Sequence, residues 1–210
     1  MNKPFTLSYF QPSEYQFSLD SVELAKKVAE LYRSHPELPS LRFLDLCSGC
    51  GIIGLEIYYY LRSIQKMDFV EIQSVYSEYF EKNLSLFDPN PNFKFVNKNY
   101  QDFGRDSKEQ YDVIVCNPPY FFAGEGVLSP SDFKNRCRFY LDASFRELIE
   151  SITRLLAPGG EAFILINRGE AYKKNRVEEG RSFLSFEFEL TILEKIRITD
   201  LVKIKRKNLY

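Results

Sequence analysis

The segment Tyr111–Phe122, which reads YDVIVCNPPYFF, ends an apolar run with an amide, two prolines and three aromatic rings. Pro118 and Pro119 fix φ and disfavour helix at the residue before each, which predicts a rigid, extended loop. In such a loop the side-chain oxygen of Asn117 and the carbonyl of Pro118 can face one pocket. Two converging acceptors match the two donors of a substrate –NH₂ group. The segment therefore predicts an amine-binding site, although a proline-stiffened turn capped by Asn117 would contain the same residues.

Three other groups of glycine or acidic residues follow apolar runs. Gly49, Gly51 and Gly54 form G-x-G-x-x-G after LRFLDL, a spacing that permits a tight turn and close approach of a ligand to the backbone. Glu71 lies about 20 residues further on, where a carboxylate can accept bonds from ribose hydroxyls. Asp102, in NYQDF, can bond an adenine amino group. A dinucleotide-binding site would also contain the glycine motif and the acidic residue that follows it. Each feature also has a purely structural alternative, because the glycines could serve only to permit a turn and the carboxylates could simply be solvated.

Strand-like and helix-like segments alternate along the chain, and they must position these residues. The predicted strands are residues 41–46, 68–73, 93–96, 111–116 and 161–167, and the predicted helices are 17–32, 51–64, 78–87 and 142–160. Asp20 and Glu23 have capping-box spacing at the first helix. Alternating apolar residues in 182–190 indicate C-terminal edge strands. The pattern predicts an α/β fold with a Rossmann-like, doubly wound sheet, mostly parallel with antiparallel C-terminal edge strands, in which ligands bind beyond the carboxyl ends of the strands.

The length and the net charge of the chain limit the classes of protein that fit this sequence. The 210 residues suit one domain, with residues 1–40 as an N-terminal lid or helix and 41–210 as the core. The net charge of −1 gives no global basic field, so a nucleic-acid partner would need a local patch. No signal peptide or membrane span is evident, which predicts a cytoplasmic protein. Four cysteines and a single histidine, His35, make a metal site an unfavoured reading of Cys47-x-x-Cys50.

Taken in order, these motifs resemble the class I S-adenosylmethionine (SAM) methyltransferases of the amino-methylating N-P-P-Y group, over about Phe17 to Asn167. In that family the glycine loop holds the methionine end of SAM, the acidic residues hold ribose and adenine, and N-P-P-Y receives the nitrogen. The resemblance implies SAM as cofactor. The implied cofactor-binding residues are Asp45, Gly49, Gly51, Glu71, Asp102 and Asn117. Phe17 and Asp20, before the first strand, would fold over the cofactor.

One subgroup looks closer still. FSLDSVELAK, VEIQ and CNPPYFFAGEGVLSPSDFKNRCRFYLD are similar to bacterial tRNA adenine-N6 methyltransferases that act beside the anticodon of a valine tRNA. CRFYL departs from that pattern, which has AR followed by a polar residue. The resemblance implies RNA, in particular tRNA, as partner. It implies catalytic roles for Asn117, Pro118 and Tyr120, and substrate contacts by Pro119, Tyr120, Phe121, Phe122, Lys134, Arg136 and Arg138. Tyr120 would stack on the base, with Phe121 or Phe122 closing the pocket, unless the two Phe belong to the core.

Other readings stay open from the residues alone. Release-factor glutamine methyltransferases share N-P-P-Y but usually carry a sizeable N-terminal helical domain, whereas about 40 residues precede the first core strand here. DNA or small-nucleotide adenine methylation, a non-catalytic binding module and a dinucleotide dehydrogenase are further alternatives. Tyr172–Arg176 and Lys203–Lys207 extend a possible phosphate-contacting rim, although such charge runs are often only solvated faces.

Overall fold

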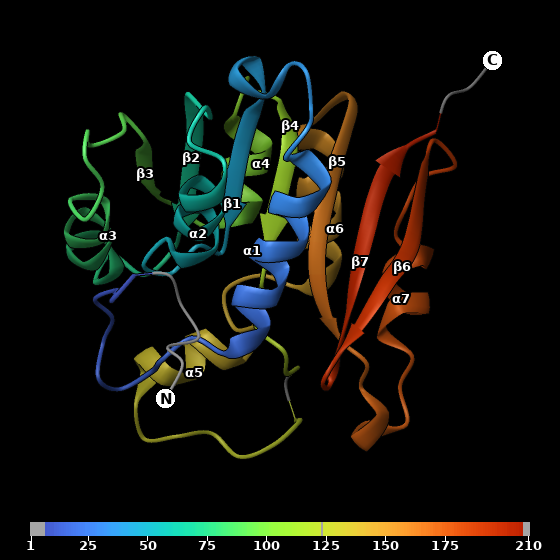
Figure 1. Cartoon of the computed structure of the whole chain (residues 1–210). Coiled ribbons are helices and arrows are strands. Elements are labelled where there is room, and N and C mark those ends of the chain that lie inside the picture. The colour runs from blue at the N-terminus through green and yellow to red at the C-terminus, as the bar shows by residue number, and fades with distance from the viewer. Residues whose placement is uncertain (1–6, 123, 208–210) are drawn as a thin grey trace.

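A seven-stranded sheet, in the order β3-β2-β1-β4-β5-β7-β6, forms the centre of the computed structural model, which describes residues 7–122 and 124–207 (Figure 1). The strands are β1 (Arg42–Leu46), β2 (Lys66–Glu71), β3 (Lys94–Asn97), β4 (Tyr111–Cys116), β5 (Leu156–Asn167), β6 (Phe188–Ile196) and β7 (Thr199–Arg206). Strands β1 to β5 are parallel, and β7 runs antiparallel between β5 and β6. The predicted α/β sheet with antiparallel C-terminal strands is confirmed.

Helices cover both faces of this sheet. One face carries α1 (Leu19–Tyr32), α2 (Ile52–Tyr60) and α3 (Tyr76–Leu84), and the other carries α4 (Tyr100–Asp106), α6 (Phe145–Leu155) and α7 (Arg176–Ser182). Single 3-10 turns occupy Leu38–Ser40 and Glu170–Tyr172. No helix among residues 7–122 and 124–207 is long and apolar enough to span a bilayer.

Side chains alternate between the two faces along each central strand, as a pleated strand requires. Phe43 and its partner Val113 belong to the core beneath α1 and α2, whereas Leu44 and its partner Ile114 belong to the core beneath α6. Because both faces are buried, apolar residues occupy most consecutive positions of these strands, which explains the apolar runs in the sequence.

Two local expectations were wrong. The first helix begins after Ser18, which places Asp20 inside the first turn, so the predicted Asp20–Glu23 capping box does not form. The capping box of this fold lies at α6 instead, where Ser144 and Glu147 bond reciprocally. The predicted helix 142–160 ends at Leu155, and its Pro-Gly-Gly is part of β5.

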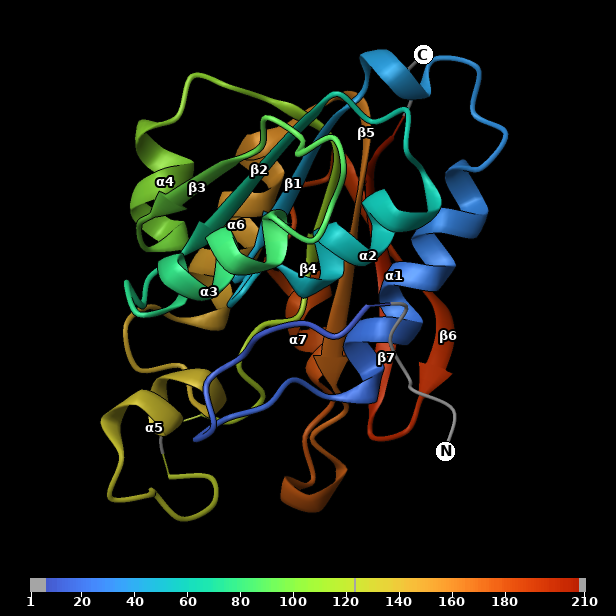
Figure 2. The same cartoon turned by 60° about the vertical axis from the view of Figure 1, so that its left-hand side comes forward.

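The carboxyl ends of the five parallel strands meet at one edge of the sheet, at the bottom of Figure 1. Helix α5 (Asp132–Arg138) and residues 7–18 lie beyond this edge (Figure 2). Neither the short α5 nor the short α4 was predicted, because seven residues give too few turns for a visible apolar period. This edge gathers the loops that contain the chemically interesting residues.

Candidate active site

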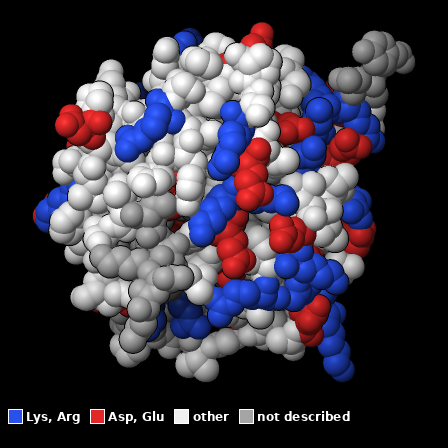
Figure 3. Space-filling view, viewed as in Figure 1, with Lys and Arg blue, Asp and Glu red and all other residues white. Residues whose placement is uncertain are grey.

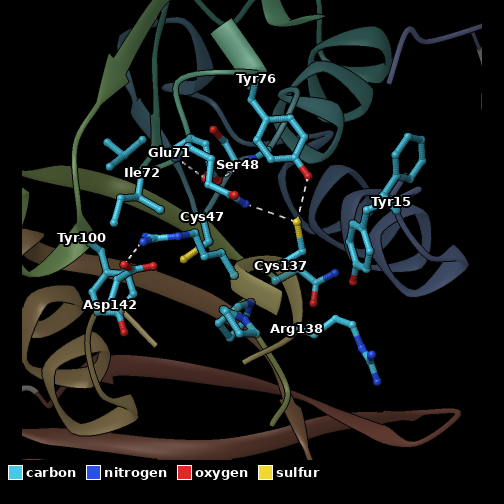
Figure 4. Close-up of a pocket in the computed structure, with 18 of the residues that line it drawn as sticks. Tyr15, Cys47, Ser48, Glu71, Ile72, Tyr76, Tyr100, Cys137, Arg138 and Asp142 are labelled. Atoms are coloured by element: carbon cyan, nitrogen blue, oxygen red, sulfur yellow. Dashed lines mark hydrogen bonds and ion pairs between the residues drawn. The ribbon is translucent and has the colours of Figure 1, made fainter. Parts of the chain in front are cut away.

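A pocket opens beyond the carboxyl ends of β1, β2 and β4 (Figure 4). Its wall is formed by the glycine loop, by Glu71–Gln73, by Asn117–Phe121, by residues after β3, by α5 and by the N-terminal segment. Four of these six parts lie at the ends of β1 to β4, and they meet here because parallel strands end at a common edge.

The carboxylate of Glu71 ties the glycine loop to the end of β2. Its Oε2 accepts from Gly49 N at 3.0 Å, and its Oε1 accepts from Gln73 N at 2.9 Å. Burial raises the pKa of Glu71, while the backbone N–H donors oppose that shift. Each carboxylate oxygen keeps a further lone pair, which leaves acceptor capacity for hydroxyl groups of a ligand. Glu71 lines the pocket as predicted.

Asp45 and Gly51 support the loop from behind, rather than facing the pocket. Asp45 is completely buried, and its Oδ2 accepts from Gly54 N in the first turn of α2 at 2.9 Å. Gly51 has a φ of 82°, and a Cβ there would lie 2.7 Å from the ring of Phe80. Both residues were predicted to bind the cofactor, but their contacts in the structure are with the protein.

Stability should fall with rising pH because of Asp45. Burial raises its pKa from 3.8 to about 7, opposed by the Gly54 N–H and assisted by the charge of Glu71. The folded state therefore holds this proton more tightly than the unfolded state, and the stabilisation is lost as pH rises towards 7. We expect a slope of about 1.4 kcal/mol per pH unit between the two pKa values.

Urea unfolding of wild type and Asp45→Asn between pH 4.5 and 7.5 measures this effect. The free energy of unfolding of wild type should fall relative to that of Asp45→Asn as pH rises. Glu30→Gln, at an exposed position of α1, serves as control and should stay parallel to wild type. A constant difference between wild type and Asp45→Asn over the whole range would contradict the assignment.

Asn117 follows β4 and lines the pocket with its side-chain amide. Its Nδ2 donates to Ser21 Oγ on α1 at 2.8 Å. Its Oδ1 accepts no hydrogen bond from any residue among 7–122 and 124–207, although it is buried. The adjoining Pro118, Pro119 and Tyr120 also line the pocket. The arrangement leaves an amide oxygen with an unmet hydrogen-bonding capacity beside the glycine loop.

The N-P-P-Y loop is held by backbone pairing with the end of α5. The N–H groups of Tyr120 and Phe121 donate to the Arg138 carbonyl at 3.0 and 2.9 Å, and Tyr140 N donates to the Phe121 carbonyl at 2.9 Å. The guanidinium of Arg138 lies 5.3 Å from the centre of the Phe121 ring. Burial raises the pKa of Tyr120, so its hydroxyl stays protonated.

Phe122 points away from Phe121, because successive side chains of an extended segment face opposite sides. Its ring packs against Tyr140, at 4.9 Å between centroids, and Phe145. The Arg176 guanidinium lies 3.6 Å from the centroid of the Phe122 ring and pairs with the buried Glu125. The substrate contact predicted for Phe122 and the phosphate-rim position predicted for Arg176 are therefore corrected to structural roles.

Asp102 does not reach the pocket. It lies in the first turn of α4, is 43% exposed at the side chain and pairs with Arg105 at 2.8 Å. The helix turns its carboxylate outwards, so the expected adenine contact is not supported. Residues just before it, Asn99 and Tyr100, line the pocket instead.

The predicted basic rim is only partly assembled. Arg136 and Arg138 line the pocket, whereas Lys134 lies on α5 outside its wall. In the C-terminal stretch, Lys203 and Lys205 pair with Glu161, and Arg206 pairs with Glu187. On the face drawn in Figure 3, basic and acidic side chains are accordingly interspersed. Lys203–Lys207 thus resembles a solvated, ion-paired face more than a phosphate site.

Several lining residues were missed by sequence reasoning. Cys137 on α5 lies with its Sγ 3.2 Å from Tyr76 Oη and 3.3 Å from Gln73 Nε2, which joins α5 to the end of β2 (Figure 4). Tyr15 comes from the N-terminal segment, and Ser21 comes from the first turn of α1. Ser21 carried a signal, since it shares a helix face with Leu24, Ala25 and Val28. No group of His, Cys, Asp and Glu within the described ranges is arranged to hold a metal ion.

Comparison with known proteins agrees with this arrangement. A SAM-dependent methyltransferase from Agrobacterium tumefaciens superposes with a TM-score of 0.60 at 12% identity, over 90% of this chain and 63% of that one. An rRNA methylase from Streptococcus thermophilus gives 0.57 at 17% identity, over 91% and 99%. The chain shares the fold of these two proteins.

Proteins that are similar to this chain in sequence give a more specific comparison than the solved structures do. Proteins named tRNA1(Val) (adenine(37)-N6)-methyltransferase from Aeromonas hydrophila and Flavobacterium psychrophilum are 30% and 29% identical, over 72% and 75% of this chain. The aligned part covers 64% and 63% of those relatives, slightly less than two thirds. A family model described as conserved hypothetical protein 95 matches residues 28–128. The resemblance recognised from the sequence is thereby confirmed.

Proposed function

We propose that this protein is a SAM-dependent methyltransferase that methylates the N6 amino group of an adenine in tRNA. The observation that carries the proposal is the buried Asn117 Oδ1, at the end of β4 and in the same pocket as the glycine loop, which has no hydrogen-bond partner in the described part of the chain. The names of the sequence relatives support adenine in tRNA as the substrate. A cytoplasmic location and a single domain over residues 1–210 belong to the same proposal.

The pocket residues fit SAM. Gly49 and Ser48 bring backbone close to the space where the methionine end of the cofactor would lie, and the spare lone pairs of Glu71 suit ribose hydroxyls. Ile72 and Asn99, which follow β2 and β3, line the same pocket and would contact the adenine ring of the cofactor. When bound, SAM supplies a methyl group already activated by its sulfonium.

Asn117 and Pro118 would hold the amine. The exocyclic nitrogen of adenine is a poor nucleophile, because its lone pair is delocalised into the ring. Hydrogen bonds from its two N–H groups to Asn117 Oδ1 and the Pro118 carbonyl favour a pyramidal nitrogen and stabilise the positive charge that develops on it. The proton can leave to water once the nitrogen is cationic, so a general base is not required.

Aromatic side chains would orient the base. Tyr120 and Phe121 line the pocket beside Asn117, and stacking of a base on an aromatic ring is worth about 1–3 kcal/mol. Arg138 flanks them at the pocket wall and would provide positive charge for an adjoining phosphate, whereas Arg136 at the same wall pairs with Asp142. Unstacked loop bases are the usual targets of sequence-specific RNA recognition, which matches an open pocket of this kind.

Transfer of labelled methyl from SAM to separated RNA and protein fractions of a cell extract tests this function. We expect the label in the tRNA fraction. Label in a release factor, and none in RNA, would replace the substrate by a glutamine amide, which carries the same –NH₂ group. No transfer to any fraction, together with no SAM binding by calorimetry, would reject the enzyme altogether and leave a binding module.

A further inference from the structure

Ser21, in the first turn of α1, forms a hydrogen bond with Asn117 in the pocket. Ser21 is 3% exposed, and its Oγ accepts from Asn117 Nδ2 at 2.8 Å. The two residues are 96 positions apart in the chain and come from different elements. Ser21 lines the pocket together with Ser18 of the same turn. The proposed catalytic amide is therefore tied to the N-terminal helix through a single side chain.

Amide orientation decides whether Asn117 can act. A side-chain amide has an acceptor end and a donor end that differ by a half-turn, and only the acceptor end suits a substrate amine. If Nδ2 faced the incoming –NH₂ group, two donors would oppose each other. Nδ2 donates one of its two hydrogens to Ser21, and Oδ1 is the end of the amide that accepts no hydrogen bond from residues 7–122 and 124–207. The Ser21 hydroxyl can also donate, so this bond fixes the place of the amide at the pocket wall and does not by itself exclude the rotated form.

We propose that Ser21 is a positioning residue that holds the Asn117 amide in place at the pocket wall for methyl transfer. The proposal rests on the proposed function and extends it to the N-terminal helix. Ser21 shares a helix face with Leu24, Ala25 and Val28, which are almost completely buried in the apolar core. The Ser21 hydroxyl lies at the pocket end of this face and is hydrogen-bonded to the side chain of Asn117. Its contribution is to the placement of the amide, and the reacting atoms do not touch it.

Kinetics of Ser21→Ala, with Ser21→Thr and Ser151→Ala as matched variants, tests this role. Ser21→Ala should lower kcat by roughly 10-fold to 100-fold, as expected for misplacement of a reacting group, while its affinity for SAM by calorimetry stays at the wild-type value. Ser21→Thr keeps a hydroxyl and should recover most of the rate. Ser151 is a fully buried helical serine whose hydroxyl donates to a backbone carbonyl of α6, so its removal should leave kcat unchanged.

A second readout does not depend on turnover. In ¹⁵N-labelled protein, the side-chain NH₂ signals of Asn117 are identified by their absence from Asn117→Ala. We expect Ser21→Ala, but not Ser151→Ala, to shift these signals, because one of the two protons loses its acceptor. Unchanged signals, or a wild-type kcat in Ser21→Ala, would overturn the proposal. If wild type itself transfers no methyl to RNA, the proposed substrate fails, and the NMR result still decides the role of Ser21.

Discussion

Replacement of Asn117 by alanine is expected to lower kcat for methyl transfer by about 10²–10³-fold, by analogy with the removal of one oxyanion-hole donor. The loss follows from removing Oδ1, one of the two acceptors proposed to hold the amine while its nitrogen becomes positively charged. Affinity for SAM should change little, because the carboxylate and glycine loop that would hold the cofactor are tied to each other through Glu71 and do not depend on Asn117.

Single-turnover rates and calorimetric titration with SAM separate these two effects. Asn90→Ala, at an exposed turn, is the matched control and should leave both quantities unaltered. An Asn117→Ala variant that methylates at the wild-type rate would show that the amide has no part in transfer. A variant that loses transfer and SAM affinity together would instead place Asn117 in cofactor binding, a role that the sequence also indicated.

Replacement of Arg176 by alanine is expected to cost about 3–5 kcal/mol of unfolding free energy. Its guanidinium pairs with Glu125 and lies over the Phe122 ring, and the side chains of both ion-pair partners are almost completely buried, at 7% and 11% exposed. Removing the cation leaves a buried carboxylate without its charge partner. Glu125 Oε2 also accepts from Phe122 N, so the segment that follows N-P-P-Y should loosen as well.

Urea unfolding of the Arg176→Ala variant, with Arg154→Ala as control, measures this loss of unfolding free energy. Arg154 pairs with Glu150 on the surface of α6, where an exposed pair of this spacing contributes about 0.3–0.5 kcal/mol. The double variant Arg176→Met with Glu125→Leu should recover much of the loss, because neither charge then remains buried. A loss in Arg176→Ala no larger than that in Arg154→Ala would contradict the buried-pair account.

Much of the fold and part of the site could be predicted from the sequence for a common reason. Buried parallel strands require continuous apolar runs, and their polar ends must meet at one edge of the sheet. Glu71 ends such a run, Gly49 and Asn117 come within three residues of the end of one, and the structure brings all three to one pocket. The short helices α4 and α5 are not subject to this constraint, and seven residues are too few to show an apolar period, which is why they were not predicted.

Orientation of single side chains was the harder problem. Phe121 and Phe122 are adjacent and chemically identical, yet one faces the pocket and the other the core, because the backbone bridge between Phe121 and Phe139 fixes which side each ring takes. Asp102 was predicted to face the pocket because it follows β3 in the sequence. It lies instead in α4, a helix that was not predicted, and its carboxylate pairs with Arg105. Such details depend on contacts between segments far apart in the chain, which local patterns do not encode.

Nucleoside analysis of tRNA after reaction with wild-type protein and methyl-labelled SAM tests the central claim most directly. The account predicts that the label is recovered in N6-methyladenosine, and that tRNA treated with Asn117→Ala contains almost none of it. Label recovered in a ring-nitrogen, carbon or ribose methyl group would contradict a pocket built to hold an exocyclic amine between two oxygen acceptors.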